Sequence, residues 1–428
     1  MIIPYGRQSL DEDDIAAVVS ALRSDFLTCG PEVEAFESEF ASFVGAKHAV
    51  VVANATDALH LAMRVSNIGP GDRVVTSPNT FLASANCAAF VGATPDFCDI
   101  DPVSYNIDPA KLEAGWKPNT KAVVAVHYGG QPAHMPEIAR IARSHGAVII
   151  EDACHGVGGE FEFEGSRWKV GGHPWADMST FSFHPVKTMT TGEGGMLVTD
   201  NDEYARRARL LRAHGIERDP SKFQGFGSSH PAFTEQGSWV YEMQDLGYNH
   251  RITDFQCALG RSQLRKLPAF IDRRLEIVAR YNEAFAILPW LTTPKVASWL
   301  EEQAVSCLEA SEPISKTLQL SSPASCVSEL NVSPCRISWH LYTVLIDFEN
   351  IGKSRSQVMT ELRAKGVGSQ VLYIPVHLQP WYRSTFGYSF GKCPVAEHYY
   401  SLALSLPLYP AMKNDDVEQV IVAIKSLV

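Results

Sequence analysis

The sequence predicts an α/β protein with a mainly parallel sheet and helices on both faces, followed by a smaller α+β domain. Apolar segments alternate with amphipathic segments between about residues 48 and 183. The apolar segments are nearly continuous, which is typical of strands buried on both faces of a parallel sheet. The chain has 428 residues, enough for two domains. We expect a large domain over 1–250 and a small one over 251–428, with which the N-terminal segment can pack.

The overall composition excludes several classes of protein. Hydrophobic residues make up 45% of the chain, and no apolar run approaches the roughly 18 residues of a membrane helix. The net charge is −11 without a basic stripe, so nucleic acid is not an expected partner. The N-terminus lacks the regions of a signal peptide, and the nine cysteines form no Cys-x-x-Cys pair. We therefore expect a cytoplasmic protein without a membrane anchor, metal site or disulfide framework.

Hydrophobic periodicity places the elements of the predicted sheet in order. Helices are expected at 11–23, about 33–43, 58–65, 81–91 and about 135–145, and strands at 49–52, 73–76, 95–99, 122–126, 147–152 and 178–183. In parallel sheets, ligands bind beyond the carboxyl ends of the strands. Four such ends carry groups suited to binding: Asn54-Ala55-Thr56, Thr80-Phe81, Asp152 with His155, and Ser182 to Lys187.

The second half of the chain is less regular. Residues 201–280 are expected to be largely helical, with a loop at 220–237 and a long helix or helix pair at 253–281. The segment 296–336 contains nine serines and three of the nine cysteines and lacks clear periodicity. This composition predicts a surface insertion or a poorly ordered loop. Regular structure then resumes, with expected strands at 341–346 and 370–373 and helices at 358–365 and from about 415.

The junction after the first strand has the features of an anion site. It contains Ala53-Asn54-Ala55-Thr56-Asp57, immediately before a predicted helix. Small and hydroxyl residues at a helix N-terminus expose backbone N–H groups, for which phosphate is a common ligand. A plain N-cap by Thr56 or Asp57 explains the same residues equally well.

A single lysine ends the apolar run at 181–187. Lys187 follows a strand end and precedes the glycine-rich turn Gly192-Glu193-Gly194-Gly195. A lysine in that position can be partly desolvated, which lowers its pKa and makes its amine nucleophilic toward carbonyls. Taken alone, it is also explained as a solvated lysine in a loop.

A lysine, an aspartate, a phosphate cradle and an aromatic residue at one sheet edge together match the needs of pyridoxal phosphate. Lys187 would bind the cofactor aldehyde as a Schiff base and then move a proton. Asp152 would pair with the pyridine nitrogen and keep it protonated, which makes the ring an electron sink. Alone, a buried aspartate is more often an N-cap or a salt-bridge partner, so the combination carries the prediction.

The remaining cofactor contacts follow from the same edge of the sheet. Phe81 or His155 would flank the faces of the ring, although Phe81 alone is explained by core packing. Ser182 and the Ala55-Thr56 turn would bind the phosphate.

Three motifs are shared with a known enzyme family. They are Ser182–Lys187 with the turn to Gly195, Glu151–His155, and Gly247–Asp254. The chain resembles the fold-type-I, aspartate aminotransferase-like sugar aminotransferases of the DegT/DnrJ/EryC1/StrS family, almost end to end except for the serine-rich segment. Four further segments resemble the branch of that family that aminates UDP-linked 4-keto-6-deoxy sugars in pseudaminic acid biosynthesis: 23–28, 214–220, 241–249 and 373–380.

The resemblance implies roles for individual residues. Lys187 matches the Schiff-base lysine, Asp152 the pyridine-nitrogen partner and Ser182 a phosphate ligand. Asn249 matches an asparagine that reaches the cofactor phosphate of the neighbouring subunit, so a homodimer with shared active sites is implied.

Contacts with a nucleotide-sugar are also implied. They involve Tyr5, the loop Asp25-Phe26-Leu27-Thr28, and the residues Trp339, His340 and Tyr342. His184 either orients the substrate beside Lys187 or fills the turn.

The implied reaction has two stages. L-glutamate gives its amine to the cofactor, which passes the nitrogen to C4 of a UDP-linked 4-keto-6-deoxy-N-acetylhexosamine, so ping-pong kinetics are expected. The main alternative is another TDP- or GDP-linked 3- or 4-keto sugar. A sugar dehydratase of the same fold is disfavoured because those relatives replace the lysine, and Lys187 is present. A non-catalytic binding protein would be expected to lose Lys187 or Asp152, and neither is lost.

Overall fold

The computed structural model describes residues 2–225, 237, 239–302 and 335–428, and a seven-stranded sheet forms its centre. The strands, in order across the sheet, are β1 (His48–Val52), β9 (Gly195–Thr199), β8 (Met178–Ser182), β5 (Val148–Asp152), β4 (Thr120–Val126), β2 (Arg73–Thr76) and β3 (Thr94–Phe97). Strand β9 runs antiparallel to β1 and β8, and all other neighbours are parallel. The predicted α/β class with a mainly parallel sheet is confirmed.

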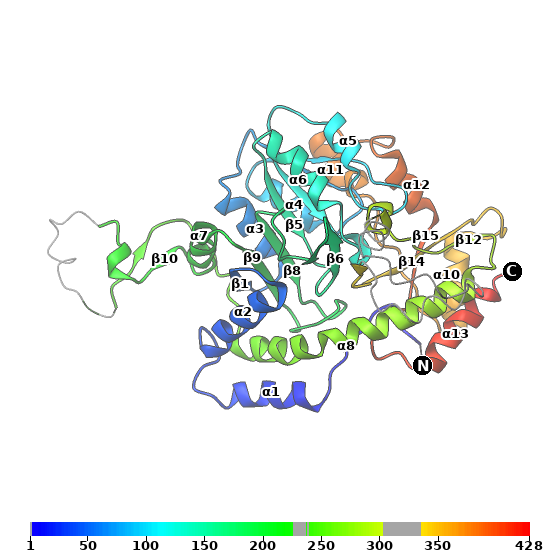
Figure 1. The fold of residues 1–428 in the computed structure, drawn as a ribbon, viewed down its shortest axis with the longest axis horizontal. Coiled ribbons are helices and arrows are strands. Elements are labelled where there is room, and N and C mark those ends of the chain that lie inside the picture. The colour runs from blue at the N-terminus through cyan, green and yellow to red at the C-terminus, as the bar shows by residue number, and fades with distance from the viewer. Residues whose placement is uncertain (1, 226–236, 238, 303–334) are drawn as a thin grey trace, which may run out of the picture.

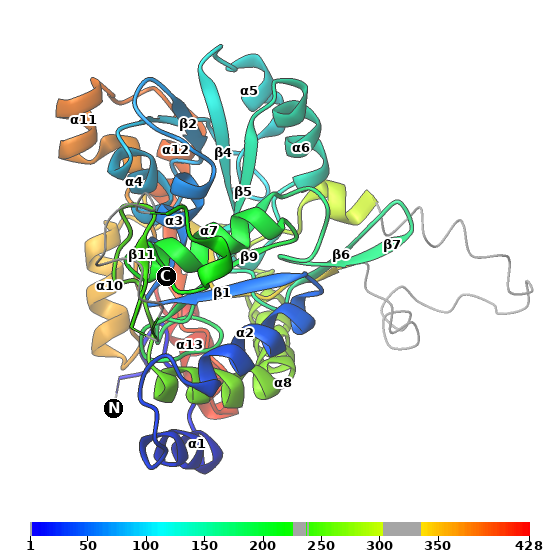
Figure 2. The same cartoon turned by 90° about the vertical axis from the view of Figure 1, so that its left-hand side faces the viewer.

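Helices cover both faces of this sheet (Figure 1). One face packs against α3 (Ala55–Val65), α4 (Ala83–Phe90) and α7 (Asp202–Arg212). The other face packs against α2 (Pro31–Val44), α5 (Pro109–Ala114), α6 (Met135–Ser144) and α8 (Asp254–Phe285). Figure 2 shows α3 and α4 on one side of β4 and β5, with α6 on the other.

Alternate residues of each central strand pack against opposite helix layers. In β4, Ala122 and Val124 lie in the core with α3 and α4, whereas Val123 and Ala125 pack with α6. All four side chains are fully buried. Burial on both faces explains why the sequence of this strand is continuously apolar.

Helix α3 begins at Ala55, three residues before the predicted start. Its N-cap is Asn54, whose side-chain oxygen accepts a hydrogen bond from the N–H of Asp57 at 2.9 Å. An asparagine N-cap satisfies one of the free N–H groups of the first turn. The first turn of α3 therefore consists of Ala55, Thr56 and Asp57 and lies directly after β1.

The 32-residue helix α8 connects the two parts of the molecule. Its first half packs against α2 and against α1 (Glu12–Leu22), and its second half against α13 (Asn414–Lys425). In Figure 1 it runs along the lower side of the molecule from α1 and α2 to α13. Because the helix begins at residue 254, the predicted division at residue 250 would fall just before it, and that division stays a prediction.

The C-terminal part contains a three-stranded antiparallel sheet. Its strands are β12 (Leu291–Thr292), β14 (Tyr342–Ile346) and β15 (Ala403–Leu406). Helices α10 (Arg355–Ala364) and α13 pack on it, and Ile3 joins the same core and pairs with Val367. The short helices η4 (Val376–Leu378), α11 (Pro380–Phe386) and α12 (Pro394–Leu402) pack nearer the large sheet. The N-terminal segment thus packs with the C-terminal part.

The prediction of a strand at 370–373 is wrong. Only Gln370 pairs there, with Ser405 of β15, a strand that the sequence analysis missed. The following backbone turns toward the large sheet: the Tyr128 hydroxyl donates to the Leu372 carbonyl, and the Val376 N–H donates to Pro78. Its backbone groups therefore bind Tyr128 and Pro78 beside the large sheet rather than a neighbouring strand.

Two other expectations need correction. Between α7 and α8 the described chain contains no α-helix but carries the short strands β10 (Ile216–Glu217) and β11 (Glu242–Met243) and the one-turn 3-10 helix η2 (Pro220–Lys222). The hairpin β6 (Glu160–Phe163) and β7 (Ser166–Lys169), which the sequence analysis missed, pairs with β13 (Cys335–Arg336). Ala297 and Leu300 are also buried against this hairpin, so both edges of the predicted surface insertion are packed.

The rest of the predicted insertion, 303–334, and most of the predicted loop at 220–237 lie outside the described residues. None of the helices that the structure does describe is long and apolar enough to cross a membrane.

Candidate active site

Six strands of the large sheet run in the same direction and end at one edge, and β9 lies between two of them, β1 and β8. The last residues of β1 and β8, Val52 and Ser182, both pair with Gly195 of β9. An added Cβ at Gly195 would lie 2.4 Å from the backbone carbonyl carbon of Asn54. Glycine is therefore required for β9 to approach the start of α3, and this approach brings Ser182 beside the Asn54-Ala55-Thr56 turn.

The predicted phosphate site is consequently assembled from distant segments. Ala55, Thr56 and Ser182 are all partly buried. The backbone N–H groups of a helix's first turn have no intrahelical partner and favour an anion. The chemistry of this cradle fits a phosphate group.

The segment that carries Asn249 is bonded to the start of α3 through its neighbour His250. The His250 carbonyl accepts the N–H of Ala53 at 2.9 Å, and His250 Nδ1 lies 3.1 Å from Asp57 Oδ2. Asn249 itself is exposed, and its side-chain oxygen accepts a hydrogen bond from Arg251 Nε at 2.9 Å.

Asp152, the last residue of β5, is 5% exposed and held by two donors. Ser84 Oγ donates to Asp152 Oδ2 at 2.6 Å, and the N–H of Cys154 donates to Oδ1 at 3.2 Å. Thr80 Oγ1 lies 2.7 Å from Ser84 Oγ. Because the Ser84 proton is committed to the carboxylate, Thr80 must be the donor in that second bond.

Ser84 is a functional candidate that the sequence analysis missed. Thr80 lies in the loop before α4 and Ser84 in its first turn, and their side-chain oxygens are 2.7 Å apart. The only available signal was this pair of hydroxyls beside the predicted Thr80-Phe81 strand end.

Lys187 lies close to Asp152 and is partly buried. Burial lowers the pKa of its ammonium group, while the nearby Cys154 thiol and Asp152 carboxylate act in the opposite direction. Its backbone is fixed by a 2.8 Å hydrogen bond from its N–H to the His184 carbonyl. A lysine with a lowered pKa is more often neutral and therefore more nucleophilic.

Two buried histidines lie beside this lysine. The ring centroids of His155 and His340 are 4.4 Å apart. Burial, together with the positive charge of Lys187, holds the pKa of each ring well below its ordinary value. His155 Nδ1 accepts the N–H of Gly129 at 3.2 Å, so Nε2 of the neutral ring carries the proton.

Aromatic side chains extend from His155 toward solvent. The Tyr373 ring lies 6.4 Å from His155 at an interplanar angle of 24°, and the Phe81 ring lies 6.0 Å from Tyr373. Phe81 is 54% exposed, so it is not a core residue. Tyr373 was missed as a site residue because its segment was predicted to be a strand.

Of the predicted substrate contacts, Tyr5, His184 and His340 are placed near Lys187. Tyr5 is partly buried, and its carbonyl accepts the N–H of Leu408 at 3.1 Å. Burial is the main cause that raises the pKa of the Tyr373 hydroxyl, and the nearby Tyr128 and Tyr5 add to the rise. A Cβ added at the next residue, Gly6, would lie 3.7 Å from Val186. His184 is exposed in the turn before Lys187.

The other predicted substrate residues lie apart from this group. Asp25, Phe26, Leu27 and Thr28 form an exposed loop that is fixed to the start of α8 through Thr28 and Leu27.

Trp339 and Tyr342 belong to the C-terminal core. Tyr342 is 0% exposed, and its hydroxyl donates to Asn282 Oδ1 at 2.8 Å. Its predicted contact with substrate stays a prediction that this placement does not favour.

A buried cluster of His127, Glu151 and His173 has the composition of a metal site. However, His127 Nδ1 accepts the N–H of Ala133, and His173 Nδ1 accepts the N–H of Trp175. Both Nε2 atoms must then carry protons, which they donate to Glu151. Burial opposes ionisation of Glu151, but His173 and His127 hold its pKa below the ordinary value. The donor set fits a hydrogen-bonded carboxylate and not a metal ion.

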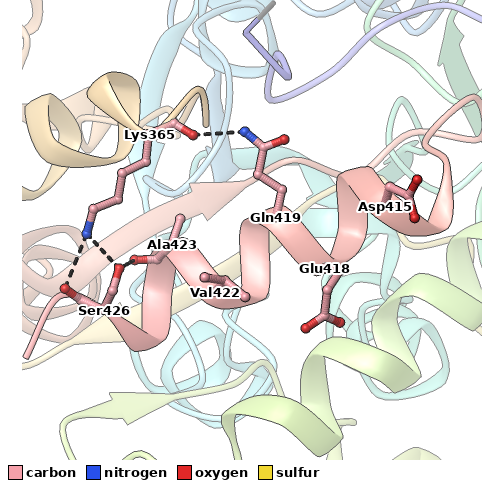
Figure 3. A pocket seen from close by; sticks show the side chains of 7 residues that line it. All are labelled: Lys365, Asp415, Glu418, Gln419, Val422, Ala423 and Ser426. Carbon is pink, nitrogen blue, oxygen red and sulfur yellow. Dashed lines mark hydrogen bonds between the residues drawn. The ribbon is translucent and has the colours of Figure 1, made fainter.

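A groove of about 490 Å³ on α13 (Figure 3) is separate from this site. Its polar side chains connect neighbouring elements: Lys365 Nζ donates to Ser426, and Gln419 Nε2 donates to the Lys365 carbonyl. The groove contains none of the predicted site residues.

The chain is similar to known proteins over its whole length. The sequence model of the DegT/DnrJ/EryC1/StrS aminotransferase family matches residues 8–319 and 309–425. The spore coat polysaccharide biosynthesis protein SpsC of Bacillus subtilis is 40% identical over 427 residues, which cover 100% of this chain and 97% of SpsC.

Solved structures of aminotransferases superpose on the chain over its whole length. PseC of Helicobacter pylori, an aminotransferase involved in the biosynthesis of pseudoaminic acid, superposes with a TM-score of 0.80 and 27% identity, covering 100% of this chain and 99% of PseC. The PLP form of Spr1654 from Streptococcus pneumoniae superposes with a TM-score of 0.80 and 25% identity, covering 100% of this chain and 98% of Spr1654. Spr1654 has also been solved in a PMP form.

Proposed function

Because the chain belongs to the DegT/DnrJ/EryC1/StrS aminotransferase family, we propose that it moves an amino group from L-glutamate to C4 of a UDP-linked 4-keto-6-deoxy-N-acetylhexosamine. The aminotransferase activity itself and the use of pyridoxal phosphate are properties of the family. The observation that carries the proposal is the juxtaposition of Lys187 and Asp152 at the carboxyl edge of the sheet. The likeness to PseC supports the sugar.

The residues at this edge fit pyridoxal phosphate. Lys187 would bind it covalently, and Asp152 would pair with its ring nitrogen. The first turn of α3, with Ala55 and Thr56, and Ser182 would bind its phosphate, in a cradle that exists because residue 195 is a glycine. When bound, the cofactor supplies an electron sink for cleavage at the amine-bearing carbon.

The protein's own groups would direct the proton transfers. The lowered pKa of Lys187 makes its amine available both as a nucleophile and as a base. His155 and His340, neutral at physiological pH because their pKa values are held low, add no positive charge beside it. His155 would flank one face of the cofactor ring, and Phe81, exposed at the rim, would lie where a ring or substrate can stack.

We also propose a homodimer with shared active sites. Asn249 is exposed, yet its segment is fastened to the phosphate turn through His250. The exposed loop Asp25-Phe26-Leu27-Thr28 presents two large apolar side chains to the outside. Both would contribute to the site of the neighbouring subunit.

A second candidate substrate is favoured by a specific observation. SpsC, a spore coat polysaccharide biosynthesis protein, shares 40% identity, whereas PseC shares 27%. The substrate in this alternative is another nucleotide-linked 3- or 4-keto sugar that supplies a polysaccharide.

A substrate panel tests the proposal. The purified enzyme, loaded with pyridoxal phosphate, is incubated with L-glutamate and UDP-, TDP- or GDP-linked keto-sugars, and the amino sugar is detected by mass spectrometry. We expect amination of the UDP-linked 4-keto sugar and none in Lys187→Ala. Preference for a TDP- or GDP-sugar would refute the UDP substrate and leave the aminotransferase intact.

A further inference from the structure

Arg274, in the middle of α8, is completely buried and binds three backbone carbonyls. Its Nη1 donates to Trp339 at 3.2 Å, to His340 at 3.3 Å and to Leu408 at 2.9 Å. These carbonyls belong to two segments that are far apart in the sequence. One arginine therefore connects α8 to both of them.

The charge of Arg274 has no counterion within the described part of the chain, where no carboxylate oxygen lies within 4.0 Å of its guanidinium group. Its Nε and Nη2 atoms are buried without a hydrogen-bond partner. Burial lowers the pKa of Arg274 to about 9, so it remains charged at neutral pH. Burying an unpaired charge is costly, and packing alone would be served better by an apolar side chain.

The two segments lead directly to predicted substrate contacts. Trp339 and His340 are themselves two of them. The Leu408 N–H donates to the carbonyl of Tyr5, a third, at 3.1 Å. His340 lies against His155, and the charge of Arg274 also contributes to the lowered pKa of His340.

We propose that Arg274 is a positioning residue that holds Tyr5, Trp339 and His340 in place for the nucleotide-sugar half of the reaction. This inference rests on the proposed function, because it assigns those three residues to the sugar. Arg274 is completely buried and acts through the backbone carbonyls that it binds. Its loss should therefore affect the sugar half-reaction more than the glutamate half-reaction.

Two variants and a matched control separate positioning from general stability. Arg274→Met keeps a flexible, unbranched apolar stem but removes all donors, and Arg274→Lys keeps the charge with fewer donors. Arg273→Met is the control, because Arg273 is the neighbouring residue on α8 and also binds a backbone carbonyl, that of Met412.

Hydrogen–deuterium exchange of the purified enzyme gives a readout that needs no substrate. In Arg274→Met we expect at least tenfold faster exchange in residues 338–341 and 405–408, with unchanged exchange in β4 and β5. Arg274→Lys should lie between this variant and wild type. Arg273→Met should leave the exchange of these two segments at the wild-type rate.

Half-reaction kinetics then test the assignment to the sugar. We expect Arg274→Met to raise KM for the keto-sugar at least tenfold, while the glutamate half-reaction, followed by the cofactor spectrum, stays within threefold of wild type. Arg274→Lys should recover part of the loss. Equal losses in both half-reactions, or unchanged exchange in residues 338–341, would overturn the inference. If wild type aminates no sugar, the proposed substrate is refuted, and the exchange data alone decide the role of Arg274.

Discussion

Replacement of Ser84 by alanine should destabilise the protein by more than the loss of an ordinary buried hydroxyl does. Ser84 is 1% exposed and donates to Asp152 Oδ2 at 2.6 Å, while accepting from Thr80 at 2.7 Å. A hydrogen bond to a charged group contributes about 1.5–3 kcal/mol and a neutral one about 0.5–1.5 kcal/mol. Since water cannot replace either bond in a buried position, Ser84→Ala should cost about 2–4.5 kcal/mol.

Urea unfolding of the cofactor-free enzyme, followed by circular dichroism, measures this cost. Ser66→Ala is the control, because Ser66 bonds to neutral groups: its Oγ donates to the Ala62 carbonyl at 2.8 Å, and it also bonds to the Tyr204 side chain. The control should lose about 0.5–1.5 kcal/mol. If Ser84→Ala is no less stable than Ser66→Ala, the inferred charge-assisted bond to Asp152 does not exist in solution.

Three other consequences of the geometry are measurable. Gly195→Ala places a methyl group 2.4 Å from the backbone of Asn54, so it should lower the unfolding free energy by about 1–3 kcal/mol. It should also weaken cofactor binding, measured by fluorescence titration. Wild-type affinity for the cofactor would refute the proposed phosphate cradle. In the folded protein the pKa of Glu151 is below its ordinary value. Ionised Glu151 therefore stabilises the fold at pH values above its unfolded pKa of about 4.3, and this contribution is lost as the pH falls below that value. Wild type should therefore lose more stability than Glu151→Gln between pH 6 and about pH 3, and parallel losses would contradict this. Acylation of Lys187 in the cofactor-free enzyme should have a pH midpoint below the ordinary lysine value of about 10.4, and a midpoint at or above it would refute the desolvation.

The sequence was most informative where one rule determined the outcome. Strands buried on both faces must be apolar along their whole length, so β4 and β5 and the polar groups at their ends could be predicted. Asp152 and Lys187 follow from that reasoning, because Asp152 ends β5 and Lys187 lies in the turn that follows β8. Their proximity depends only on the order of the parallel strands.

Contacts between distant segments could not be predicted in the same way. Ser84 binds Asp152 across 68 positions, and the only local sign was the pair of hydroxyls, Thr80 and Ser84, beside a predicted strand end. The apolar residues 371–373 looked like a strand, but their backbone contacts Tyr128 instead. Tyr342 lies in a segment that resembled a substrate-binding one, yet its hydroxyl bonds to Asn282 in the core.

The central claim is that Lys187 holds pyridoxal phosphate, and borohydride reduction tests it most directly. The cofactor-loaded enzyme is reduced, digested and analysed by peptide mass spectrometry, which identifies the amine that carries the cofactor. We predict that the label lies on Lys187 and that Lys187→Ala carries none. A label on a different lysine, or an unlabelled wild-type enzyme, would contradict the account.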